Sequence, residues 1–157
     1  MVKFFPSKIL IEIENKHENI SPILFYGNES GQISVLIKSI FNILKNKIEI
    51  DEIKFLDHKK NNYEELEQIL INPSLFSKKN FIVLKNPQEK LINELEKIEK
   101  NKNFLIINGE GLRPNSKLKS LFDNHKDFIS VPCYKLSKID IKKIINNFTS
   151  NNNINLQ

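Results

Sequence analysis

The sequence is poor in several residue types, and each shortage limits what the protein can be. Its 157 residues include one cysteine, Cys133, so the chain holds neither a disulfide framework nor a cysteine-rich metal site. No apolar run approaches the ~18 residues that a membrane-spanning helix needs. The first residues also lack the long apolar stretch of a signal peptide. We therefore expect a protein of the reducing cytoplasm, with no membrane partner.

Arginine is almost absent although the chain is basic. Lysine and arginine total 24 against 19 acids, giving a formal charge of +5, and Arg113 is the one arginine. The sequence has 25 isoleucines, 22 asparagines and no alanine, which indicates an AT-rich genome and explains part of the lysine excess. Because arginine is the residue best suited to binding phosphate, we expect a solvated lysine surface with weak, sequence-independent DNA binding.

Short apolar runs alternate with amphipathic segments along the chain. The runs are apolar on both faces, which is typical of parallel strands covered on both sides. Helical spacing lies between them, clearest in the stripe that Ile33, Ile37, Ile40 and Leu44 share. The alternation predicts an α/β fold, a parallel sheet flanked by helices. The predicted strands are residues 23–26, 50–56, 81–84, 104–107 and 128–131, and the helices 33–44, 66–70, 91–98 and 118–122. Residues 9–13 fit a helix or a strand.

The pattern changes after Val131. Ser137 is typical of a helix cap, and Ile141, Ile144, Ile145 and Phe148 follow at helical spacing. We predict one domain over residues 1–135 and the start of a following helical domain over 136–157. We therefore expect the chain to be part of a longer protein.

A degenerate phosphate-binding loop follows the first strong strand. A P-loop needs four residues between its glycines and then a lysine. Here three residues separate Gly27 from Gly31, and Gln32 stands at the lysine position. The strand over 81–84 is followed by Lys85-Asn86, where acids would hold magnesium. The position is that of a nucleotide site without its chemistry, so we expect no ATP binding, no cofactor, no metal and no catalytic residue.

The other reactive side chains give weaker signals. His17, His58 and His125 lack the spacing of metal ligands. Asp57 and His58 come at a strand end, where α/β enzymes place catalytic groups, but no nucleophile motif accompanies them. We interpret the pair as a loop acid beside a loop histidine, and Cys133 as a small buried side chain.

Two adjacent large apolar residues lie in a turn. Pro73 should end the preceding helix near Asn72, which leaves Leu75 and Phe76 outside regular structure. Exposing both would be costly, so they either fold back onto the core or anchor a partner. The sequence pattern alone leaves both interpretations open.

Several segments together resemble the bacterial DNA polymerase III delta subunit, a component of the clamp loader, in its N-terminal domain. The resemblance spans nearly the whole chain, in order. It rests on residues 24–29 (LFYGNE), 73–84 (PSLFSKKNFIVL), 105–107 (LII), 112–118 (LRPNSKL) and 131–134 (VPCY).

The resemblance implies an AAA+-like fold whose nucleotide site is degenerate. It implies a non-catalytic subunit of the polymerase holoenzyme that binds the sliding clamp (beta subunit) and opens it for loading onto primed DNA. The clamp-binding residues would be Ser74, Leu75 and Phe76, with other clamp loader subunits as further partners. The residues leave two alternatives open, an active P-loop-type ATPase and a lysine-rich nucleic-acid-binding module.

Overall fold

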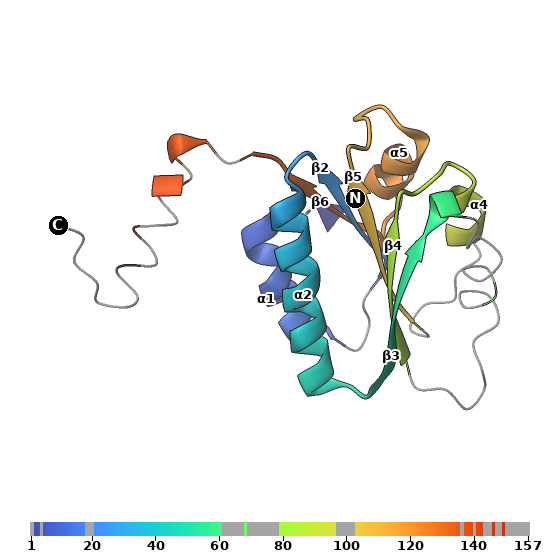
Figure 1. Ribbon diagram of the computed structural model, residues 1–157, viewed down its shortest axis with the longest axis horizontal. Coiled ribbons are helices and arrows are strands. Elements are labelled where there is room, and N and C mark those ends of the chain that lie inside the picture. The colour runs from blue at the N-terminus through green and yellow to red at the C-terminus, as the bar shows by residue number, and fades with distance from the viewer. Residues whose placement is uncertain are drawn as a thin grey trace.

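A single parallel sheet organises the part of the chain that the structure describes. The computed structural model describes residues 2–3, 5–17, 21–60, 68, 79–96, 103–135, 137–139, 141–142, 146 and 149. Six strands lie side by side in the order β1-β6-β2-β5-β4-β3, and every paired neighbour is parallel (Figure 1). The expected parallel sheet is confirmed.

The strands coincide with the apolar runs of the sequence. They are β1 (Val2–Lys3), β2 (Ile23–Gly27), β3 (Ile50–Asp57), β4 (Lys79–Lys85), β5 (Phe104–Glu110) and β6 (Ile129–Cys133). All five predicted strands are therefore confirmed. The two-residue β1 was not predicted, because two residues carry no periodicity.

Helices cover both faces of the sheet, which explains why the central strands are apolar throughout. The helices α1 (Pro6–Asn15) and α2 (Ser30–Lys47) cover one face, and α4 (Leu91–Leu95) and α5 (Lys117–Asn124) cover the other (Figure 1). Phe25 belongs to the first apolar cluster, and its neighbours Leu24 and Tyr26 belong to the second. All five residues of β2 are buried.

The ambiguous segment at residues 9–13 is part of helix α1. Pro6 stands in its first turn, where proline is well tolerated because its missing N–H has no partner in a helix. Ile9 and Ile13 are buried one turn apart, facing α2 and the sheet. Helix α2 follows as predicted, with its isoleucine and leucine stripe buried.

The structure describes only a few residues of two of the expected helices. The helix predicted over 66–70 lies outside the described residues except for Gln68, and so does most of the segment after Lys142. Near the end, the Ile141 N–H donates to the Ser137 carbonyl at 3.0 Å, which is one helical turn. Among the described residues, no helix combines the length and the apolar character needed to cross a membrane.

Candidate functional site

The loop that joins β2 to α2 lies at the carboxyl edge of the sheet, where the sequence predicted a degenerate P-loop that does not bind nucleotide. In open parallel α/β folds, ligands bind at this edge. Gly27 is the last residue of β2, and Gly31 already lies inside α2. Asn28, Glu29 and Ser30, the first residue of α2, separate the two glycines, which is one residue fewer than in a P-loop.

The backbone of this loop is bonded to its own neighbours. The Gly111 N–H donates to the Gly27 carbonyl at 2.9 Å, and the Glu29 N–H donates to the Cys133 carbonyl at 3.2 Å. A P-loop holds phosphate oxygens with backbone N–H groups that point into the loop. In this chain the Glu29 N–H already has a carbonyl acceptor at the end of β6.

Gln32 occupies the position of the P-loop lysine and lines a hollow at the start of α2. Its Oε1 atom is buried and has no hydrogen-bond partner among the described residues. A carboxamide carries no charge, so it cannot replace a lysine beside the terminal phosphates of a nucleotide. Gly27 thus ends β2, Gly31 and Gln32 lie in the first turn of α2, and a glutamine stands where a P-loop has its lysine.

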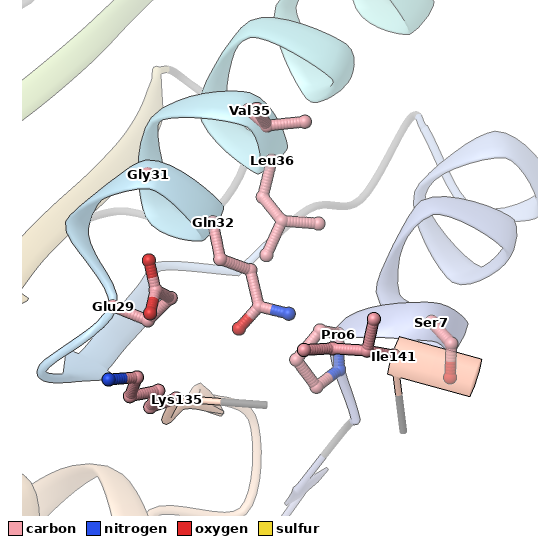
Figure 2. A pocket seen from close by; sticks show the side chains of 9 residues that line it. All are labelled: Pro6, Ser7, Glu29, Gly31, Gln32, Val35, Leu36, Lys135 and Ile141. Atoms are coloured by element: carbon pink, nitrogen blue, oxygen red, sulfur yellow. The ribbon is translucent and has the colours of Figure 1, made fainter. Parts of the chain in front are cut away.

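The hollow beside Gln32 is open, with a volume of about 610 Å3. Figure 2 shows Glu29 and Lys135 on one side of it and Pro6 and Ile141 on the other, with Gln32 pointing between them. Among the described lining residues the charged ones are Glu29 and Lys135, and Val35 and Leu36 add apolar surface. The charges of these described side chains are balanced, and such a lining suits apolar contacts better than a triphosphate, which needs an excess of cations.

The ends of β3 and β4 carry a polar cluster where a magnesium site would lie. Asp57 accepts from the side-chain amide of Asn86 at 2.9 Å and from the Lys59 N–H at 3.0 Å. The Asn86 hydrogen bond, then that of Lys59, lowers the pKa of the Asp57 carboxyl. Asn86 has a φ of 51°, a left-handed conformation that asparagine tolerates better than most residues.

His58 is buried next to this cluster, with 2% of its surface exposed. Its Nδ1 atom accepts from the Gln88 N–H at 3.1 Å, which ties the end of β3 to the turn after β4. Burial, then the charge of Lys90, lowers the pKa of His58, and Asp57 opposes this shift. Asn86 donates to Asp57 and Gln88 donates to His58, so each of the two side chains bonds to a different residue after the end of β4. No group of three or more metal-ligating side chains exists among the described residues.

Cys133 is fully buried at the end of β6, in agreement with the sequence interpretation. Burial raises the pKa of its thiol to about 12. A thiol that stays protonated is a poor nucleophile, so Cys133 is a packing residue.

The predicted clamp-binding residues Ser74, Leu75 and Phe76 lie outside the described residues, which resume at Lys79 with β4. Sequence reasoning also missed the contacts between the Asn28–Glu29 segment and the end of β6. Residues about 107 positions apart meet there, and no local pattern reports such a contact.

Comparison with known proteins reveals a likeness of fold. The chain is similar to the structure of the Bacillus subtilis DNA clamp loader delta protein (YqeN), with a TM-score of 0.62 and 13% sequence identity. The match covers 92% of this chain and 47% of that protein, so the chain spans about half the length of its neighbour. The likeness shows a shared α/β fold, a parallel sheet with helices on both faces. Neither a family model nor a curated protein sequence matches the chain.

Proposed function

We propose that this chain is the N-terminal domain of a clamp loader delta subunit, which binds and opens the sliding clamp during DNA replication. The observation that carries the proposal is the fold match over 92% of the chain to a clamp loader delta protein. The loop between β2 and α2 supports the proposal independently. It lies where a P-loop would lie, and its Glu29 N–H is hydrogen-bonded to the Cys133 carbonyl. A subunit of this kind needs no ATPase site of its own.

Such a subunit would open the clamp with the free energy that it gains on binding the clamp. A ligand shifts an equilibrium between a closed and an open ring only by its difference in affinity for the two forms. A rigid sheet covered by helices on both faces can present a binding segment without deforming. The partners of this function are the sliding clamp and other clamp loader subunits, with DNA bound weakly.

Ser74, Leu75 and Phe76 form the proposed clamp-binding segment. Each of the two large apolar side chains contributes roughly 1.5–3 kcal/mol when it is fully buried in a partner's pocket. Such residues dominate an interface, and truncating one costs on the order of 2 kcal/mol in binding. The pair therefore supplies most of the affinity of a small contact.

The test is the double substitution Leu75→Ala/Phe76→Ala, measured by titration calorimetry against the sliding clamp of the same organism. We expect clamp affinity to fall at least roughly 100-fold, at ~1.4 kcal/mol per decade. The free energy of unfolding should change by no more than about 0.5 kcal/mol. The matched control is Phe5→Ala/Ile11→Ala, which removes two side chains that are 66% and 60% exposed and should leave clamp binding unchanged.

Two outcomes contradict the proposal. If wild-type protein does not bind the clamp, the function is wrong. If the double variant loses several kcal/mol of stability while its folded fraction still binds, the two residues are core residues and another surface contacts the clamp.

A further inference from the structure

The loop after β2 and the chain leaving β6 are joined by two hydrogen bonds that run in opposite directions. The Glu29 N–H donates to the Cys133 carbonyl at 3.2 Å, and the Lys135 N–H donates to the Asn28 side-chain oxygen at 3.3 Å. Each segment therefore donates once and accepts once. We call this set of four residues, Asn28, Glu29, Cys133 and Lys135, the β2–β6 clasp.

An aromatic contact lies between the two hydrogen-bonded segments. Tyr26 precedes the clasp on β2 and Tyr134 lies within its β6 side, and their rings meet edge to face with centroids 6.1 Å apart. Tyr26 also contacts helix α5, because the Lys119 ammonium lies 5.0 Å from the centre of the Tyr26 ring. Lys119 is itself paired with Asp123, which accepts from the Ser130 hydroxyl on β6.

We propose that Asn28 is a positioning residue that fixes the direction in which the chain leaves β6, in the place where a P-loop protein binds phosphate. Its side-chain oxygen accepts a hydrogen bond from the backbone N–H of Lys135, the residue after Tyr134. The Glu29 N–H, a group that a P-loop uses for its ligand, holds Cys133 instead. The direction of the chain after β6 is thus fixed by hydrogen bonds within the protein and does not depend on a bound nucleotide.

The clasp adjoins the hollow beside α2, and two of its residues line it. Glu29 and Lys135 both line the hollow, on the side opposite Ile141 (Figure 2). Lys135 and, among the described residues that follow it, Ile141 therefore lie beside the start of α2. This inference goes beyond clamp binding, and it stands or fails independently of it.

Backbone hydrogen exchange of the whole chain tests the role of Asn28. In Asn28→Leu, which has no side-chain acceptor, we expect the Lys135 amide to exchange about fivefold faster, the factor that one net hydrogen bond contributes. In Asn28→Asp, which keeps an acceptor oxygen at the same place, exchange at Lys135 should match the wild type. The control Asn42→Leu changes an exposed asparagine on α2 and should leave Lys135 unaffected.

Two further measurements keep the proposal falsifiable. Amides of the buried strand β2 must exchange at the wild-type rate in all variants, which separates a local effect from global unfolding. Trypsin cleavage after Lys135 gives a second readout, which should be faster in Asn28→Leu and unchanged in Asn28→Asp. Adding Mg-ATP to the wild type should change neither readout.

The proposal is overturned if Asn28→Leu exchanges and is cleaved at Lys135 like the wild type. It is equally overturned if Asn28→Asp behaves like Asn28→Leu, because the acceptor oxygen is then not the relevant group. A change in Lys135 exchange on adding Mg-ATP to the wild type would show that a nucleotide, and not the clasp alone, sets the exit.

Discussion

A Cβ atom added to Gly27 would lie 1.9 Å from the carbonyl oxygen of Cys133 and 2.6 Å from its carbonyl carbon. The two residues are register partners at the ends of the parallel strands β2 and β6. Gly27 also has a φ of +133°, a conformation that residues with a side chain rarely adopt. The backbones of β2 and β6 can therefore contact each other here only because the residue is glycine.

We expect Gly27→Ala to lower the free energy of unfolding by about 3 kcal/mol or more. The new methyl group meets backbone atoms that cannot rotate away, and the positive φ adds strain. Urea unfolding followed by circular dichroism measures the change. The matched control is Gly31→Ala, whose added Cβ would meet only the Glu29 carboxylate at 3.5 Å.

Gly31→Ala should be neutral or stabilising by up to about 1 kcal/mol, because alanine is the better helix former. Equal losses in the two variants would contradict the view that the contact with Cys133 sets the requirement at Gly27.

The degenerate loop predicts that Mg-ATP does not bind. The loop is one residue short, Gln32 replaces the lysine, and the Glu29 N–H is bonded to Cys133. The end of β4 offers Lys85 and Asn86 where an acid would hold the metal. Titration calorimetry with Mg-ATP should show no saturable heat. A dissociation constant in the micromolar range would refute this interpretation and favour an active P-loop enzyme.

The sequence predicted the sheet well because the strands are buried on both faces. A run such as Phe104 to Ile107 has no polar position, and burial by helices on both sides is the physical reason. Residues 9–13 were harder, since Ile9, Ile11 and Ile13 alternate as in a strand. Ile11 is 60% exposed while Ile9 and Ile13 are buried, so the buried residues are spaced as in a helix.

The sequence predicted the local part of the candidate site but not its contacts with distant segments. Local spacing placed Gly27, Gly31 and Gln32 where a strand passes into a helix, and the structure has Gly27 at the end of β2 and Gly31 and Gln32 in the first turn of α2. The bonds from Asn28 and Glu29 to the end of β6 depend on which strands are neighbours in the sheet. That order is fixed by packing over the whole domain, and no short segment encodes it.

Cys133 should be inert toward thiol reagents in the folded protein. Its side chain is fully buried, and burial raises the pKa of the thiol to about 12. Since the thiolate is the reactive form, labelling at pH 8 should be more than about 100-fold slower than for an exposed cysteine of ordinary pKa. Tyr134→Cys provides the comparison, because this neighbouring position is half exposed. Labelling of both thiols at similar rates in the native protein would contradict the burial of Cys133.

His58 should make the protein less stable as the pH falls. Burial and the charge of Lys90 lower the pKa of His58 below its usual 6.5, so the unfolded chain takes up a proton before the folded one does. Stability due to His58 is therefore fully present above pH ~6.5 and is lost as the pH falls toward the lowered pKa, by at most about 1.4 kcal/mol per pH unit for one proton. Protonation of Nδ1 also removes the acceptor of the Gln88 N–H.

Urea unfolding at pH 7.5 and 5.5 measures this dependence. In His58→Gln, which carries no titrating group, the difference between the two pH values should shrink, although stability at pH 7.5 falls because the packing at a buried site changes. His17→Gln, which removes a partly exposed histidine, serves as the matched substitution measured beside it. If His58→Gln keeps the full difference, the titration of other groups accounts for it, and His58 is not the residue that links proton uptake to unfolding.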